Sequence, residues 1–213
     1  MIAAIVPVKT LASSKSRLFP ALDRESVERL SVAMLGDVVD ALLSVSALDR
    51  VAVVTPDPEV AAVVRPTAAE VLLSDVPGLN ASLDDASATL APGPDDATLV
   101  VLGDVAGARA EELAKLIDAC APRGVALAPS SDGGTSALVR RPANVIAAGF
   151  GANSAAVHRK LASSAGIPFC EVALPSLAID IDEPEDLVNF ANSGSAGART
   201  RALLADLLPG LTS

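Results

Sequence analysis

Residues 1–18 read MIAAIVPVKTLASSKSRL, an apolar run followed directly by a basic loop. The first eight residues have the length and composition of a buried strand. The loop after them carries Lys9, Lys15 and Arg17, and no acidic residue precedes Asp23. The formal net charge of the whole chain is −10, so this loop is a positive segment on an acidic protein. Fixed cations, hydroxyls and backbone N–H groups after a strand are what a polyphosphate needs.

Beyond this opening, strand-length apolar runs alternate with amphipathic helical patterns, which is typical of βαβ units. Strands are expected at residues 2–8, 50–55, 71–73, 98–102, 125–128, 137–140 and 178–182. Helices are expected at residues 24–43, 58–64, 80–90, 109–120, 154–165, 185–192 and 198–208. Asp23 is suited to cap the first helix. We predict an α/β fold with one doubly wound, mainly parallel sheet of Rossmann-like type, forming a single domain over residues 1–213, with a flexible hinge at 192–197 before the last helix.

The composition excludes several classes of function. Hydrophobic residues make up 51% of the 213 positions, but there is no Trp or Tyr and only four Phe, so base stacking on aromatic rings is nearly excluded. The acidic balance also argues against nucleic-acid backbones. No apolar run reaches the roughly 18 residues of a membrane span, and the N-terminal apolar run precedes its basic residues, unlike a signal peptide. We expect a cytoplasmic protein, with Cys120 and Cys170 as reduced core thiols.

Ligands of open α/β sheets bind beyond the carboxyl ends of the strands, so the residues after each expected strand are candidates for a site. Asp104 follows the fourth strand after a single glycine, where it is either a turn residue or a ligand. Asp180 and Asp182 end the last expected strand, and the period of two places both on one face. A divalent cation is one reason for that pair. The alternative is that Asp182 caps the helix that begins near Pro184.

Four further features each allow a structural and a functional interpretation. Residues 131–135 (SDGGT) suit either a nest of N–H donors around an anion or an ordinary hairpin turn. Gly151 would let an anion approach a helix start, where Ser154 is either a ligand or the N-cap. Asn80 is either a helix cap or an amide that contacts a base or ribose. His158, inside the same helix as Ser154, is more typical of a packed residue than of a catalyst.

Together these stretches resemble one family, the phospholactate and phosphoenolpyruvate guanylyltransferases of coenzyme F-420 biosynthesis. The matching blocks, in the order of that family, are IVPVK with SKSRL (5–9 and 14–18), GLNASL (78–83), LGD (102–104), DGGT (132–135), FGANS with His158 (150–158) and IDIDEPEDL (179–187). Two positions depart from the pattern. Val105-Ala106 stands where Leu-Pro or Ile-Pro is usual, and Ser136 replaces Asn or Ala.

The resemblance implies a nucleotidyltransferase variant of the fold and a role for each matching residue. Metal ligands for Mg²⁺ are implied at Asp104, Asp180 and Asp182, acceptor ligands at Thr135, Gly151 and Ser154, and nucleotide ligands at Lys9, Lys15, Arg17 and Asn80. Lys15 and Arg17 also carry the implied catalytic role. An ionised acceptor phosphate would attack the α-phosphorus of GTP and release pyrophosphate. Since that phosphate is already a nucleophile, positioning and cations are sufficient and no general base is needed.

The acceptor implied first is phosphoenolpyruvate, which would give enolpyruvoyl-diphospho-guanosine. The alternatives are 2-phospho-L-lactate and 3-phosphoglycerate. A labile product would pass to a downstream transferase, and a homodimer is one possible assembly. A sugar-nucleotide glycosyltransferase also has an Asp-x-Asp motif and is the more remote alternative. A dinucleotide-binding oxidoreductase fits poorly, because no glycine occurs before Gly36.

Overall fold

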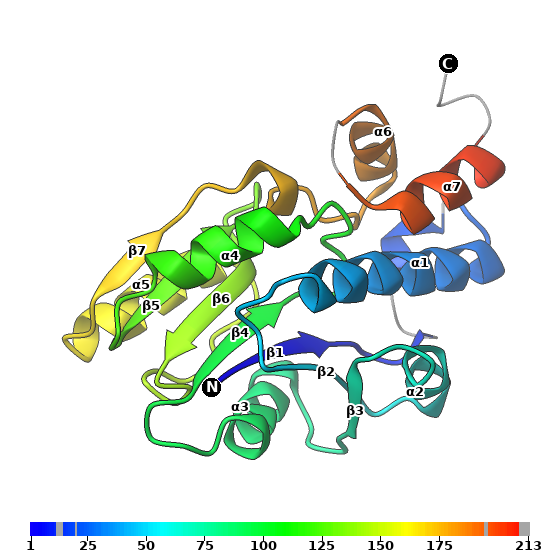
Figure 1. The fold of residues 1–213 in the computed structure, drawn as a ribbon. Helices are drawn as coiled ribbons and strands as arrows, with labels where there is room; N and C mark the ends of the chain where they lie inside the picture. Colours follow the sequence, from blue (N-terminus) through cyan, green and yellow to red (C-terminus); the bar gives the residue numbers. More distant parts are fainter. Residues whose placement is uncertain (12–14, 20, 194–195, 209–213) are drawn as a thin grey trace.

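The computed structural model describes residues 1–11, 15–19, 21–193 and 196–208 of the chain. Its centre is a seven-stranded sheet in the order β3-β2-β1-β4-β6-β5-β7, in which β6 runs antiparallel to both neighbours and the other pairs are parallel (Figure 1). The strands are β1 (Ile2–Pro7), β2 (Arg50–Thr55), β3 (Glu70–Leu73), β4 (Ala97–Val101), β5 (Gly124–Pro129), β6 (Thr135–Arg141) and β7 (Phe169–Glu171). The helices are α1 (Arg24–Leu43), α2 (Pro58–Val64), α3 (Leu79–Leu90), α4 (Ala110–Ala119), α5 (Ser154–Ser164), α6 (Pro184–Asn192) and α7 (Ala198–Leu207), with short 3₁₀ turns η2 (Ser16–Leu18) and η3 (Pro175–Leu177).

The predicted doubly wound, mainly parallel sheet is confirmed, and each predicted helix is present to within about one residue at either end. The strand predicted at residues 178–182 is wrong. That segment begins with Ala178 in a helical conformation (φ −77°, ψ −23°), and its backbone bonds to two loops, because Ser131 N donates to Ala178 O (3.3 Å) and Ile181 N donates to Asp104 O (3.4 Å). The seventh strand is instead β7, whose three residues pair with β5 and are too short to stand out as an apolar run.

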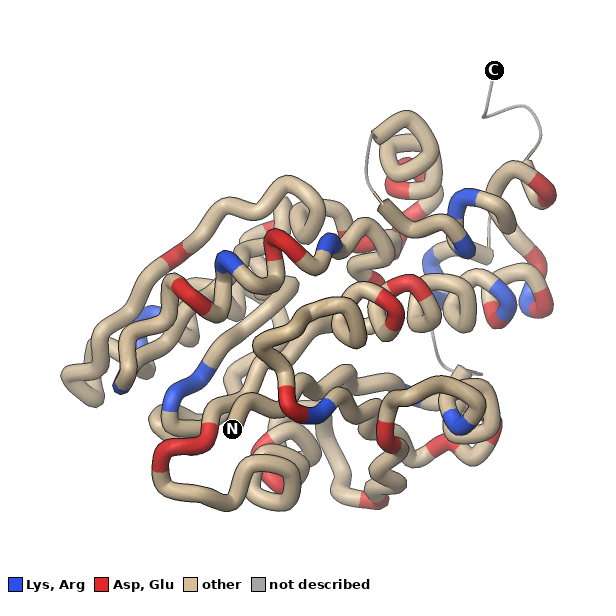
Figure 2. Tube along the Cα trace, in the orientation of Figure 1, with Lys and Arg blue, Asp and Glu red and all other residues tan. Residues whose placement is uncertain are grey.

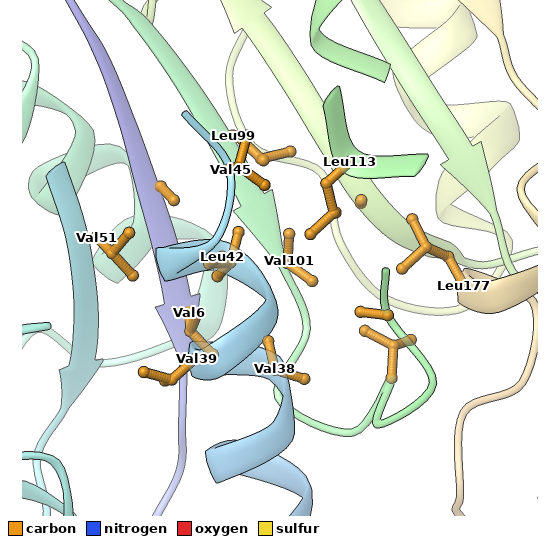
Figure 3. Close-up of a cluster of buried hydrophobic side chains, with 14 of the residues drawn as sticks. Val6, Val38, Val39, Leu42, Val45, Val51, Leu99, Val101, Leu113 and Leu177 are labelled. Atoms are coloured by element: carbon orange, nitrogen blue, oxygen red, sulfur yellow. The ribbon is translucent and has the colours of Figure 1, made fainter. Parts of the chain in front are cut away.

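Two apolar layers cover the sheet because alternate residues of each strand face opposite sides. Along β1, Ala4 and Val6 belong to one core cluster, whereas Ala3 and Ile5 belong to the other. Helices α1, α2 and α4 supply the first layer and α3 and α5 the second. Figure 3 shows the first layer, with Val6 beside side chains of α1 and β4. No helix among the described residues is long and apolar enough to cross a membrane.

A third cluster joins the two ends of the chain. Side chains of α1, α6 and α7 pack together with Leu18 and Ile181. Asp37 of α1 accepts hydrogen bonds from the backbone N of Arg199 (3.0 Å) and of Thr200 (2.8 Å), which satisfies the first turn of α7. The predicted hinge at 192–197 lies partly outside the described residues, at positions 194–195. The described part places α7 directly on α1 (Figure 1).

Candidate active site

The antiparallel strand β6 brings its first residue to the edge where the parallel strands end. Val101 at the end of β4 pairs with Ala137, and Leu102 N donates to Ser136 O (3.1 Å). Thr135 therefore begins β6 at the edge where Lys9 follows β1 and Asp104 follows β4. The site expected beyond the carboxyl ends of the strands is thus built from both parallel and antiparallel strands.

The basic loop and the acidic residues meet through Lys15. Its Nζ lies 2.6 Å from Asp104 Oδ2 and 3.4 Å from Asp182 Oδ1, and only 11% of its side chain is exposed. Burial disfavours the ammonium ion, but the two carboxylates outweigh that effect and raise the pKa of Lys15 above its ordinary value. Arg17, which is 68% exposed, places Nη1 3.0 Å from Asp182 Oδ2 and 3.4 Å from Glu183 Oε1. Lys9 is exposed at the end of β1.

Asp104, on the loop after β4, is brought near Asp180 and Asp182, on the segment before α6. Burial, and then the charge of Asp104, raises the pKa of Asp180. The Oδ1 atom of Asp104 is buried and has no hydrogen-bond partner among the described residues. Acidic residues are otherwise spread over the helices and connections of the molecule (Figure 2). Three carboxylates, one of which has an unsatisfied buried oxygen, give this edge a strongly negative position.

This donor set fits a hard divalent cation in kind, because every donor is a carboxylate oxygen and one of them lacks a partner. The described residues contain no group of three acidic, His or Cys side chains already close enough to share one ion. In this conformation the positive charge between Asp104 and Asp182 is the Lys15 ammonium.

The alternative interpretation of Asp182 as a helix cap is wrong. The N-cap of α6 is Glu183, and Asp186 accepts from the backbone N of Asp182 (3.0 Å) and of Glu183 (2.8 Å). The carboxylate of Asp182 is therefore free to pair with Lys15 and Arg17. We did not predict a role for Glu183 or Asp186, although an acidic residue three positions after an N-cap is a recognisable capping-box signal.

The implied acceptor ligands Thr135 and Ser154 are in direct contact. Ser154 Oγ donates to Thr135 Oγ1 (3.0 Å), and both side chains are almost fully buried. Ser154 is not the N-cap of α5, because that position belongs to Asn153, which has a left-handed backbone (φ 55°). A register shift opposite Ala128 and Pro129 leaves Ser136 as an extra residue in β6. Such a bulge redirects the neighbouring side chain, and here Thr135 reaches α5.

The third feature of this cluster is His158, which we expected to be a packed residue. It is fully buried, and its Nδ1 lies 3.1 Å from Thr135 Oγ1. Its ring meets Phe150 edge-on, with 5.0 Å between the ring centroids. The position of a lone His in a helix gives no signal of these contacts, since Thr135 is 23 residues away in the sequence.

The glycine loops settle one further alternative. Residues 130–134 form the turn between β5 and β6, so the hairpin interpretation is confirmed. The anion nest is wrong, since Gly133 N donates to Ser130 O (3.2 Å) and Gly134 N to Asp132 Oδ1 (2.9 Å). Gly151 has φ 136°, and among the described residues other than its chain neighbours, no atom lies within 4 Å of the position that a Cβ would occupy. Open space therefore adjoins the backbone at Gly151, in a conformation that favours glycine.

Asn80 is bonded to the loop that carries Gly151. Its Nδ2 donates to Phe150 O (3.0 Å) and its Oδ1 accepts from Phe150 N (2.7 Å). Asn80 does not cap α3, because Gly78 is the N-cap. The amide retains one hydrogen and one lone pair for any ligand.

The two departures from the family pattern both lie at buried positions, with different consequences. Val105 and Ala106 are fully buried, so apolar packing holds the turn after Asp104. Ser136 is also buried, and its hydroxyl has no partner among the described residues.

A comparison with protein families places the sequence. Residues 2–208 match the family model described as "Guanylyl transferase CofC like". The chain belongs to this guanylyltransferase family. The resemblance found in the sequence is confirmed, and the protein is a nucleotidyltransferase.

Curated relatives of this CofC-like chain span nearly its whole length. It is 38% identical to a phosphoenolpyruvate guanylyltransferase of Sphaerobacter thermophilus, over 92% of this chain and 95% of the relative. It is 35% identical to a 3-phospho-D-glycerate guanylyltransferase of Phenylobacterium zucineum, over 97% of both chains.

Solved structures share the fold of the CofC-like chain. A Desulfovibrio desulfuricans G20 protein, assigned by name to the nucleotide-diphospho-sugar transferases, has a TM-score of 0.81 at 17% identity, over 99% of this chain and 96% of that one. A Mycobacterium tuberculosis H37Rv protein solved as a complex with manganese has a TM-score of 0.55 at 21% identity, over 90% of this chain and 98% of that one.

Proposed function

We propose that the protein transfers a guanylyl group from GTP to phosphoenolpyruvate and releases pyrophosphate, with Mg²⁺ at the acidic edge of the sheet. The names of the relatives at up to 38% identity support this acceptor. One relative at 35% identity is named for 3-phospho-D-glycerate, which makes that acid the second candidate. The reaction joins two anions, so the site has to supply positive charge on both substrates.

The observation that carries the proposal is the contact of Lys15 with both Asp104 and Asp182. It places a cation and a set of carboxylates at one edge of the sheet, 2.6 Å apart at the closest pair. Asp104, Asp180 and Asp182 would hold Mg²⁺, which would supply positive charge against the phosphates. Lys15, beside two of these carboxylates, would contact the triphosphate.

The remaining cations would hold the nucleotide. Arg17 is exposed beside Asp182, and Lys9 is exposed at the end of β1, so both can reach solvent-borne phosphates. Their fixed charge orients the α-phosphorus for in-line attack, which is the main requirement of phosphoryl transfer. Asn80 retains one hydrogen and one lone pair, with which it would contact the nucleoside.

The acceptor would lie against Thr135, Gly151 and Ser154. The open space at Gly151 would admit an anion close to the backbone, and the pair of hydroxyls would donate a hydrogen bond to one of its oxygens. The acceptor phosphate is ionised at neutral pH, so it attacks without transfer of a proton to the protein.

One assay tests this proposal. Purified protein, GTP and Mg²⁺ are combined with phosphoenolpyruvate, 2-phospho-L-lactate or 3-phosphoglycerate in turn, and pyrophosphate is measured, with a downstream transferase present to trap a labile product. We expect phosphoenolpyruvate to give the highest kcat/KM. Faster turnover of another acid would reassign the acceptor, and no pyrophosphate with any of them would contradict the proposal. Release of a nucleoside diphosphate from a sugar nucleotide would favour a glycosyltransferase.

Four related statements are part of the same proposal. The product would enter coenzyme F-420 biosynthesis, and a downstream transferase would consume it. The protein would act in the cytoplasm, and a homodimer is one possible assembly that light scattering would test.

A further inference from the structure

A buried relay of hydrogen bonds lies behind the implied acceptor ligands. Gly149 N donates to His158 Nε2 (3.0 Å), and His158 Nδ1 lies 3.1 Å from Thr135 Oγ1. Ser154 Oγ donates to the same Thr135 oxygen (3.0 Å). Because His158 and Thr135 are almost fully buried, water does not compete strongly for these bonds.

The contact with Gly149 fixes the tautomer of His158. A backbone N–H can only donate, so Nε2 must present its lone pair. The hydrogen of the neutral ring is therefore on Nδ1 and is donated to Thr135 Oγ1. Burial, and then the charge of Arg140, lowers the pKa of His158 to about 4, so the ring is neutral at pH 7.

This tautomer determines what the two hydroxyls can offer a ligand. Thr135 Oγ1 uses both of its lone pairs, one for His158 and one for Ser154, so its own hydrogen must be donated elsewhere. If Thr135 were the donor and Ser154 the acceptor of the bond between them, the number of remaining hydroxyl hydrogens would be the same. The pair holds two hydrogens, one lies between the oxygens, and the other remains to be donated. Among the described residues, no acceptor takes it.

The loop that carries Gly151 leads into Ser154. Ser154 N donates to Gly151 O (3.1 Å), and among the described residues other than the chain neighbours of Gly151, no atom lies within 4 Å of the position that a Gly151 Cβ would take. A ligand held at the Gly151 backbone would therefore lie within one helical turn of Ser154.

We propose that His158 is a positioning residue, which holds the Thr135–Ser154 hydroxyl pair so that it donates one hydrogen bond to an anionic group of the acceptor. The inference rests on the proposed function and deepens it. A phosphate or carboxylate oxygen has lone pairs and no hydrogen, so it matches the donated hydrogen. A neutral ligand group that points its own hydrogen at the pair would bring two donors into contact. Two unpaired donors in a buried site weaken binding.

Two substitutions separate the roles of the two ring nitrogens. In His158→Asn, an amide N–H can occupy the position of Nδ1 and keep the bond to Thr135. In His158→Gln, the amide oxygen can occupy the position of Nε2 and keep the bond to Gly149, while the donor to Thr135 is lost. We expect His158→Gln to raise the acceptor KM about tenfold, with the GTP KM within about twofold, and His158→Asn to recover most of that loss. Equal effects of both variants on both KM values would show a packing role and overturn the proposal.

A direct readout avoids any dependence on the variants. His158 is the single histidine of the chain, so nitrogen-15 NMR of protein without a histidine tag reports its tautomer unambiguously. We expect a neutral ring with the hydrogen on Nδ1 at pH 7. An Nε2–H tautomer or a charged ring would overturn the proposal even if a variant fails to fold. If wild-type protein instead releases no pyrophosphate with phosphoenolpyruvate, the proposed function fails while the tautomer result stands.

Discussion

Lys15 Nζ lies 2.6 Å from Asp104 Oδ2, although the two residues are 89 positions apart in the sequence. This ion pair joins the basic loop after β1 to the acidic turn after β4. A second contact, at 3.4 Å to Asp182, extends it to the segment before α6. In the proposed function a metal and a triphosphate would bind at this position. The carboxylates would then pair with the metal, and Lys15 would pair with the phosphates.

Substitution of Asp182 by Asn tests the acidic edge. The change removes a carboxylate that pairs with Lys15 and Arg17 but keeps the side-chain volume, so the fold should persist. We expect guanylyl transfer to fall at least about a hundredfold. We also expect Mg²⁺ to raise the thermal midpoint of the wild type but not that of Asp182→Asn. Asp85→Asn, at an exposed position of α3, is the matched control. Near-normal turnover of Asp182→Asn at fixed metal concentration would rule out a metal role.

Substitution of Asn80 by Ala tests which substrate this side chain serves. Both hydrogen bonds to the Phe150 backbone would be lost, and we expect unfolding to become easier by about 2 kcal/mol, measured by denaturant titration. Because the proposed contact with the nucleoside would be lost, the GTP KM should rise. The acceptor KM should rise as well, because Phe150 precedes Gly151. A rise confined to the acceptor KM would contradict the nucleoside role of Asn80.

Substitution of Gly151 by Ala tests the approach to the backbone. Its φ of 136° strains any other residue, so we expect a loss of about 1–2 kcal/mol of stability together with a large rise in the acceptor KM. Gly166→Ala is the control, because Gly166 also has a positive φ (65°) and open space around it, at the end of α5. The control should lose similar stability with unchanged KM. An unaltered acceptor KM in Gly151→Ala would place the acceptor elsewhere.

The buried His158 predicts a loss of stability in mild acid. Its pKa is lowered to about 4 in the folded protein, against about 6.5 when unfolded, so the unfolded chain binds more protons between these values. The neutral ring therefore adds to the free energy of unfolding above pH 6.5. This stabilisation, about 2 kcal/mol, is lost as the pH falls toward 4. Urea titrations at pH 7 and pH 4.5 measure this loss. The free energy of unfolding should fall more between these pH values in the wild type than in His158→Asn. Equal drops would show that the ring stays accessible to protons.

Much of the fold could be predicted because its signals are local. The capped helix α1 and the alternating core residues of β1 follow from side-chain type and spacing alone. The segment at residues 178–182 could not be predicted in this way. Its apolar and acidic alternation suits a strand, but no neighbouring strand pairs with it, and two loops take its hydrogen bonds instead.

Residue type and order were sufficient to identify the family, six of the seven strands and the charged candidates. Only the tertiary structure decided how those residues act together. It paired Lys15 with Asp104, gave the cap of α6 to Glu183, and joined His158 to Thr135 through a bulged strand. The physical reason is that hydrogen bonds and ion pairs require atoms within about 3 Å, and contacts between distant segments are set by how helices and loops pack on the sheet.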